Sequence, residues 1–185
     1  MTHLCLIRHG QTNWNVQGRY TGQSDIPLNG TGKIQAKSLI PQLQNRQIDA
    51  IFSSDLLRAS ETASIISDYF QIPVQLDSRL REINQGVWEG QHLDDIKLKY
   101  NEIWQQRETN PHNVRPPGGE TLSEVSTRVI TAIEEIASKY PDGAVLIISH
   151  GLAIALILCK IKDIPMEQAY DLIPSNTEPI WIDWK

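Results

Sequence analysis

Two short segments of this 185-residue chain combine histidine with glycine directly after an apolar run. Arg8-His9-Gly10 follows the first run, and His150-Gly151 follows another run near the far end of the sequence. A buried strand that ends in such a segment places its imidazole at the end of a sheet where the carboxyl ends of the strands lie. A guanidinium can bind a phosphoryl group through two hydrogen bonds, while a neutral imidazole attacks the phosphorus atom. The two segments therefore favour phosphoryl transfer.

Segments with strand and helix patterns alternate along the chain, which favours an α/β fold with a mostly parallel sheet covered on both faces. We expect a three-layer α/β/α sandwich whose site lies at the carboxyl ends of the central strands. The predicted strands cover residues 4–8, 49–53, 73–76, 144–149 and 180–184. The predicted helices cover residues 31–45, 56–69, 93–106, 152–159 and a stretch that begins at the capping box Thr121–Glu124.

The connections between these elements carry their own expectations. Residues 10–30 have the composition of a polar loop that is long for a compact domain, which suggests a functional loop. Pro41 is expected to kink the predicted helix at 31–45. The strand at 73–76 begins with a proline, which favours the edge of the sheet.

Length and charge limit the classes of function. A chain of this length suits a single domain over residues 1–185, and its 17 basic against 22 acidic side chains argue against a nucleic-acid or membrane surface. No apolar stretch approaches the roughly 20 residues of a membrane span, and no leader segment is recognisable. Cys5 and Cys159 lack metal-ligand spacing, so we expect free, buried thiols in a cytoplasmic protein.

A set of further motifs resembles one protein family. These motifs lie at residues 7–12 with Asn15, 22–28, 53–63, 81–82, 117–120 and 149–151. In this order along the chain they resemble the motifs of the histidine phosphatase superfamily, which contains cofactor-dependent phosphoglycerate mutases and many small phosphatases. The resemblance implies a phosphoglycerate mutase-like fold, in which one strand of the sheet runs antiparallel.

The resemblance also implies catalytic roles. His9 would become phosphorylated, and Arg8, Arg58 and His150 would surround the transferring phosphoryl group. Glu82 would be the general acid for the leaving oxygen and then the base for water. Further roles on the substrate side follow from the same match. Asn15 and the backbone near Gly151 would donate hydrogen bonds to the phosphoryl group, and a substrate-lining segment would contain Thr21, Gly22 and Gln23.

The chemistry of these residues sets conditions on them. His9 must be neutral to attack, whereas His150 would act best when protonated. Glu82 would hold a proton for the leaving alcohol if apolar neighbours shield it, and a salt bridge to Arg79 or Arg81 is the alternative. Which ring nitrogen of His9 attacks is left open at this point.

Other polar residues receive simpler interpretations. Glu120 stands just before the capping box, so it either orders the site or stabilises the start of the helix. His3, His92 and His112 lack partners at metal-ligand spacing and are expected at the surface. Because arginines and histidines would neutralise the phosphate, we expect no metal and no cofactor.

The family contains both phosphatases and mutases. The residues that follow Glu82 resemble the phosphatase branch, and the gap before His150 leaves little chain for the larger cap with which a mutase excludes water. We therefore predict a metal-independent phosphomonoester hydrolase that acts through phosphohistidine on a small phosphorylated metabolite. A cofactor-dependent phosphoglycerate mutase is the alternative. A non-catalytic binding protein is a third possibility, which the presence of His9, Glu82 and the arginines disfavours. The oligomeric state stays open.

Overall fold

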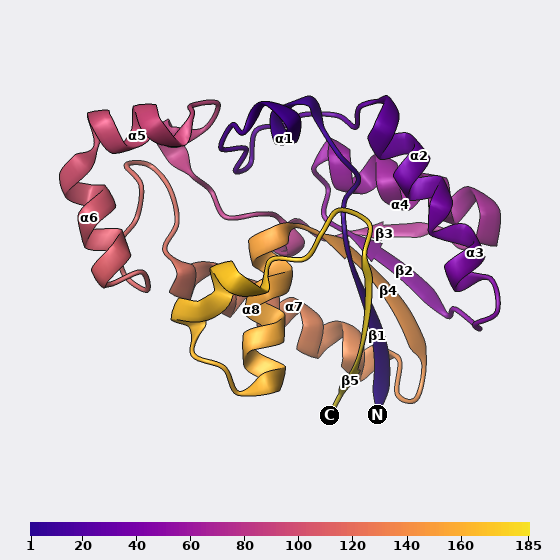
Figure 1. The fold of residues 1–185 in the computed structure, drawn as a ribbon. Helices are drawn as coiled ribbons and strands as arrows, with labels where there is room; N and C mark the ends of the chain where they lie inside the picture. The colour runs from indigo at the N-terminus through magenta and orange to yellow at the C-terminus, as the bar shows by residue number, and fades with distance from the viewer.

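The computed structural model describes all residues from Met1 to Lys185, and a five-stranded mixed sheet forms its centre (Figure 1). The strand order is β3-β2-β4-β1-β5, with β5 antiparallel to β1 and all other neighbours parallel. The strands are β1 (Thr2–Arg8), β2 (Ala50–Ser53), β3 (Val74–Leu76), β4 (Ala144–Ser149) and β5 (Pro179–Trp184). The predicted mostly parallel sheet is confirmed, including one antiparallel strand and the edge position of β3.

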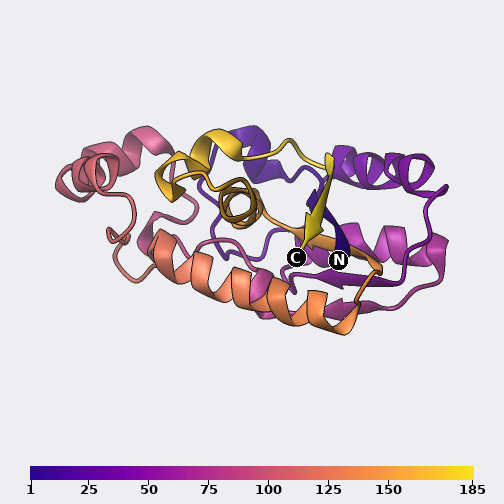
Figure 2. The ribbon, with the colours of Figure 1, turned by 90° about the horizontal axis from the view of Figure 1, so that it is seen from below.

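Helices cover both faces of the sheet, as predicted for a three-layer sandwich (Figure 2). The α-helices are α1 (Asn13–Gln17), α2 (Gly30–Ser38), α3 (Ile40–Leu43), α4 (Leu57–Phe70), α5 (Leu93–Lys99), α6 (Asn101–Thr109), α7 (Leu122–Lys139) and α8 (Gly151–Lys162). The 3-10 helices are η1 (Ser78–Leu80), η2 (Gly86–Trp88) and η3 (Met166–Leu172). None of these helices is both long and apolar enough to cross a membrane.

Two hydrophobic cores lie on opposite faces of the sheet. The larger core joins one face to α7, α8 and η3, and the smaller core joins the other face to α3 and α4. Because side chains alternate along a strand, Leu6 of β1 and Ile147 of β4 belong to the first core, whereas Ile7 and Ile148 belong to the second. The apolar helix α8 is buried along nine successive residues, which explains why it lacks a polar face.

Two of the predicted helices are interrupted. The helix expected at 31–45 divides into α2 and α3, and Pro41 occupies the first turn of α3, where a missing N–H costs nothing. The helix expected at 93–106 divides at Tyr100, whose backbone leaves the helical region and whose ring packs 6.2 Å from that of Trp88. The loop expected at 10–30 contains the short helix α1.

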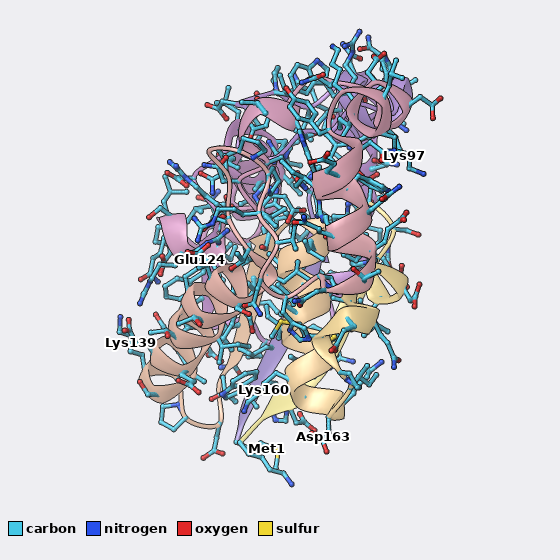
Figure 3. All side chains as sticks on the ribbon, turned by 90° about the vertical axis from the view of Figure 1, so that its left-hand side faces the viewer. Met1, Lys97, Glu124, Lys139, Lys160 and Asp163 are labelled. Carbon is cyan, nitrogen blue, oxygen red and sulfur yellow. The ribbon has the colours of Figure 1, made fainter.

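Helices α5 and α6 form an arm beside the sheet, separate from the layers that cover it (Figure 1). The two chain termini lie next to each other, because the first and last strands are paired from Thr2 with Trp184 onward. Figure 3 shows the separation of the α5–α6 arm from the sheet from another side, with Lys97 of α5 towards one end of the molecule and Met1 at the other. The capping box at Thr121 is present and begins α7 as predicted.

The packing of β4 in the first core predicts a large cost for truncation. Ile147 is fully buried in the centre of the sheet, so Ile147→Ala is expected to lower the free energy of unfolding by about 2–5 kcal/mol. Ile34→Ala is the matched control, because 70% of that side chain is exposed; its effect should stay within about 0.5 kcal/mol. Urea denaturation measures both. Equal effects of the two substitutions would contradict this description of the core.

Candidate active site

The two histidines meet at the carboxyl ends of neighbouring strands. Arg8 pairs with Ser149 at the end of the β1–β4 ladder, so His9 and His150 each stand one residue beyond it. Their ring centroids lie 5.2 Å apart. The parallel pairing of β1 with β4 therefore produces the juxtaposition predicted from the sequence, although more than 130 residues separate the two positions in the chain.

His9 is held in one tautomer. Its Nδ1 lies 2.7 Å from the carbonyl oxygen of Gly10, and because a carbonyl only accepts, Nδ1 must carry the proton. Nε2 then holds a lone pair, which accepts a 3.2 Å hydrogen bond from Nε of Arg58. Burial first, and then the charge of Arg58, holds the pKa of His9 well below its ordinary value of 6.5. The imidazole is therefore neutral, with Nε2 as its nucleophilic atom.

Arg58 is held by backbone oxygens and not by a carboxylate. It stands in the first turn of α4, is only 1% exposed, and donates to the carbonyls of Ser24 at 2.8 Å and Gly22 at 2.7 Å. Burial lowers the pKa of this guanidinium to about 10, so it still carries its charge at neutral pH. The backbone N–H of Leu57, which could have served an anion at the start of α4, donates instead to Asp25.

His150 differs from the expectation of a protonated side chain. It is fully buried, and burial first, followed by the charge of Arg58, holds its pKa well below 6.5. Its Nε2 lies 2.8 Å from Oγ of Ser54, and that oxygen already accepts from the backbone N–H of Leu56. Ser54 can donate its hydroxyl proton to Nε2, and in that arrangement the proton of the neutral ring is on Nδ1. Nδ1 is buried without a partner, and in this tautomer it would donate to a phosphoryl oxygen.

The guanidinium of Arg8 also has an N–H group without a hydrogen-bond acceptor. One of its terminal nitrogens donates to the carbonyl of Pro174 at 2.8 Å, while Nε is buried without a partner. The chain approaches this guanidinium closely at Gly151, where a Cβ would lie 2.9 Å from the side chain of Ile173 and 3.5 Å from Cζ of Arg8. The same C-terminal segment contacts His9, whose carbonyl accepts a 2.7 Å bond from Asn176. The sequence analysis did not identify this segment.

The side chain of Glu82 reaches the start of α8. Its carboxylate accepts from the backbone N–H of Leu152 at 3.1 Å and from that of Ile83 at 2.9 Å. The alternative of a salt bridge to Arg79 or Arg81 is wrong, since those guanidinium groups pair with other carboxylates. The carboxylate is therefore available to a substrate.

Arg128 holds the backbone around Glu82 in place. It donates to the carbonyls of Arg79, Arg81 and Glu82 at 2.6–2.9 Å and forms two 2.9 Å bonds to the carboxylate of Glu120. Glu120 also accepts from the backbone N–H of Asn84 at 2.8 Å. Of the two interpretations left open for Glu120, ordering of the site is the one that its contacts favour. The sequence analysis did not identify Arg128, because its pattern is that of an ordinary arginine on a helix.

The predicted substrate-lining segment is tied to Glu82 and Arg58. The side chain of Gln23 donates to the carbonyl of Glu82 at 3.1 Å, and the carbonyl of Gly22 accepts from Arg58. Thr21 donates only to a nearby backbone oxygen. Asn15 accepts from the backbone of Thr12 in the capping box of α1, so only its amide N–H groups remain for a phosphate. The structure thus brings Gly22 and Gln23 to the catalytic centre and uses Asn15 partly to cap a helix.

Glu89 holds this segment in place and was not identified from the sequence. Its carboxylate accepts from the backbone of Gln23 at 2.8 Å, from the hydroxyl of Ser24 at 2.6 Å and from the backbone of Gln85 at 3.1 Å. The turn at Gly22 needs glycine, because its φ is positive and a Cβ would lie 2.2 Å from Glu89. No group of three or more His, Cys, Asp or Glu side chains is arranged to hold a metal ion.

This geometry defines a class of protein. A neutral histidine whose Nε2 lone pair faces Arg58, two guanidinium groups and a second buried imidazole converge at the carboxyl ends of a mostly parallel sheet. Donors of this kind bind and transfer phosphoryl groups. A comparison with known families assigns the class: the profile of the histidine phosphatase superfamily (branch 1) matches residues 4–185. The chain belongs to that superfamily, as its sequence motifs predicted.

Individual relatives agree with this assignment. The uncharacterized phosphatase PhoE of Bacillus subtilis is 36% identical over 162 residues, which are 88% of this chain and 78% of the relative. The probable phosphoglycerate mutase GpmB of Shigella boydii serotype 18 is 35% identical over all of this chain and 86% of its own. The crystal structure of the alpha-ribazole phosphatase from Shigella flexneri superposes with a TM-score of 0.90 at 29% identity, over 99% of this chain and 91% of the other. The predictions of a phosphatase and of a phosphoglycerate mutase-like fold are confirmed.

The two buried histidines predict a pH dependence of stability. Both have folded pKa values below 6.5, so the unfolded chain binds more protons as the pH falls through that value. The free energy of unfolding should therefore be highest above about pH 6.5. It should fall between about pH 6.5 and 5, by at most about 2.7 kcal/mol per pH unit for the two histidines together.

Urea denaturation of wild type and His9→Gln at pH 5, 6, 7 and 8 measures this decline. The variant is expected to lose about half of the slope between pH 5 and 6. His3→Gln, which changes an exposed histidine, should keep the wild-type slope. A wild-type stability that does not change across this range would show that the histidines are not buried in the neutral form.

Proposed function

We propose that this phosphatase is a metal-independent hydrolase of small phosphomonoesters that forms a phosphohistidine at His9. The observation that supports this most directly is the set of atoms around that side chain. The Nε2 lone pair of His9 faces Nε of Arg58, while Nε of Arg8 and Nδ1 of His150 are buried without acceptors. Phosphoryl oxygens are the acceptors that would satisfy these donors, and they would bring the phosphorus atom next to the nucleophile.

The first chemical step transfers the phosphoryl group to the enzyme. As the ester binds, Arg58 exchanges its bond to His9 for bonds to phosphoryl oxygens, which frees the Nε2 lone pair. Nε2 forms the new bond to phosphorus while the bond from phosphorus to the ester oxygen breaks. Glu82, in its protonated form, gives a proton to the leaving oxygen. Arg8, Arg58 and His150 stabilise the charge on the three equatorial oxygens.

The second step releases phosphate. Glu82, now ionised, accepts a proton from a water molecule as that water attacks the phosphorus atom. The bond from phosphorus to Nε2 breaks, and His9 returns to its neutral form with the proton still on Nδ1. The hydrogen bond from Nδ1 to the Gly10 carbonyl stays in place throughout, and it stabilises the positive charge that the ring carries in the intermediate.

The helices between Glu82 and His150 favour phosphatase activity over mutase activity. The long helix α7 from this interval covers the sheet, so only α5 and α6 remain to form a cap over the site. A mutase must protect its phosphohistidine from water, which requires a more extensive enclosure. The cofactor-dependent phosphoglycerate mutase remains the alternative, and mutase activity without net phosphate release would establish it.

We also infer a cytoplasmic location and a single domain over residues 1–185. Cys5 and Cys159 are both unpaired and buried, and burial raises the pKa of the Cys5 thiol to about 12. Two free thiols of this kind are typical of proteins from reducing compartments.

Substitution of the proposed nucleophile tests the mechanism. His9→Ala is expected to lower kcat for aryl phosphate hydrolysis at least about 1000-fold, because it removes the atom that forms the bond to phosphorus. The assay is phosphate release after dialysis against EDTA, together with trapping of an acid-labile, base-stable phosphoenzyme. His3→Ala is the matched control and should keep wild-type activity. Activity that survives in His9→Ala, or that EDTA removes, would contradict the proposal.

A second variant tests the general acid. Glu82→Gln is expected to lower kcat for an alkyl phosphate by about 100-fold or more, since the alkoxide leaves only with a proton. The loss should be much smaller for 4-nitrophenyl phosphate, whose leaving group needs little protonation. Glu102→Gln, on the exposed surface of α6, is the control. Equal losses on the two esters would show that Glu82 acts only by position or charge.

A further inference from the structure

Two of the nine arginines in the chain are buried, and neither has a carboxylate partner. One is Arg58, which the proposed function pairs with a phosphoryl group. The other is Arg107 near the end of α6, which is 6% exposed and lies outside the catalytic centre. A buried cation without a counter-charge is costly, and proteins keep such a group where a ligand supplies the missing charge. Arg107 therefore requires an explanation of its own.

The groups in direct contact with the Arg107 guanidinium are neutral and mostly aromatic. Its guanidinium donates to the hydroxyl of Tyr170 and, at 3.4 Å, to the side-chain oxygen of Gln85. Its Cζ lies 5.2 Å from the ring centre of Trp88, 5.4 Å from that of Tyr170 and 6.0 Å from that of Trp104. These contacts orient the guanidinium and leave its positive charge unneutralised. The buried indole N–H of Trp88 in the same cluster also lacks an acceptor.

Arg107 lines a pocket of about 290 Å³ whose other walls are the rings of Tyr20, Trp104 and Tyr170. The residues that line the pocket come mainly from α6 and η3. Glu108 and Glu167 also line the pocket. Each of these is already bonded, the first to the indole N–H of Trp104 and the second to His112.

Two short segments connect this pocket to the catalytic centre. Glu82 and Gln85 are three residues apart, so their Cα atoms lie within roughly 11 Å of each other. Tyr170 and Pro174 are four residues apart, and Pro174 accepts the hydrogen bond from Arg8. The leaving group of an ester bound at His9 is thus within reach of Arg107.

We propose that Arg107 is a specificity-determining residue that binds a second anionic group, a carboxylate or a phosphate, on the leaving portion of the substrate. This inference rests on the proposed function and narrows its substrate class to phosphomonoesters with a further negative charge. The aromatic walls accept the uncharged body of the leaving group, and the guanidinium binds its anionic end. Glu108 and Glu167 line the same pocket but are bonded to Trp104 and His112, so Arg107 is the group there that would bind an anion.

The test compares esters that differ only in this charge. The kcat/KM values of phenyl phosphate, 4-carboxyphenyl phosphate and 4-phosphonophenyl phosphate are measured for wild type and for Arg107→Met, which keeps an apolar side chain against the aromatic rings. Arg107→Met is expected to lose at least about tenfold more on the anionic esters than on phenyl phosphate, mainly through KM. The ester with the larger ratio identifies carboxylate or phosphate as the preferred group. Arg115→Met, which removes an exposed arginine, should leave the ratios at their wild-type values.

Arg107→Lys is a second variant, which keeps the positive charge but loses the planar guanidinium. Its preference for the anionic esters over phenyl phosphate, measured as a ratio of kcat/KM values, is expected to fall less than that of Arg107→Met. Equal losses on all three esters in Arg107→Met would overturn the proposal and make Arg107 a structural support for the aromatic cluster. A wild type that shows no preference for the anionic esters would overturn it as well, whether or not the variants fold. If phenyl phosphate itself is not hydrolysed in a manner that depends on His9, the proposed function fails, and that outcome is distinct from a loss of preference.

Discussion

The hydrogen bond from Arg58 to Nε2 of His9 is the interaction on which the rest of the site depends. It can form only while His9 is neutral with its proton on Nδ1, and the carbonyl of Gly10 enforces that tautomer. It also requires a guanidinium at a fixed place inside the protein, which the carbonyls of Gly22 and Ser24 provide. The loop that carries those carbonyls therefore helps to position the nucleophile.

The arginines around the site are held mainly by neutral backbone oxygens. Arg58 and Arg8 contact carbonyls and no carboxylate, so their charges are available to a phosphoryl group. Arg128 is different, because it combines three carbonyls with the carboxylate of Glu120 and is fully bonded within the protein. In the proposed mechanism this difference separates the arginines that would bind substrate from the one that holds Glu82 in position. Arg107 also contacts no carboxylate, which is why we propose it as a ligand-binding arginine.

Much of the architecture could be predicted from the sequence. Alternating strand and helix patterns predicted all five strands, the two covered faces and the capping box of α7, because those features depend on local patterns of apolar and capping residues. The break at Tyr100 was not predicted. Its ring packs against Trp88 from a different segment, and a local pattern does not record such a contact. The protonated form expected for His150 was also wrong in this structure, because burial depends on how completely the neighbouring elements enclose the ring.

The sequence by itself determined the family, the α/β layers, and the presence of two histidines at strand ends with arginines nearby. These conclusions follow from local order along the chain, which a sequence records directly. Only the tertiary structure decided which nitrogen of His9 is free, that Glu82 lies at the start of α8, and that Arg128, Glu89 and the segment after η3 hold the site. Each of these depends on contacts between residues far apart in the chain. Burial and the direction of a hydrogen bond, which set the charge and tautomer of a side chain, exist only after those residues have come together.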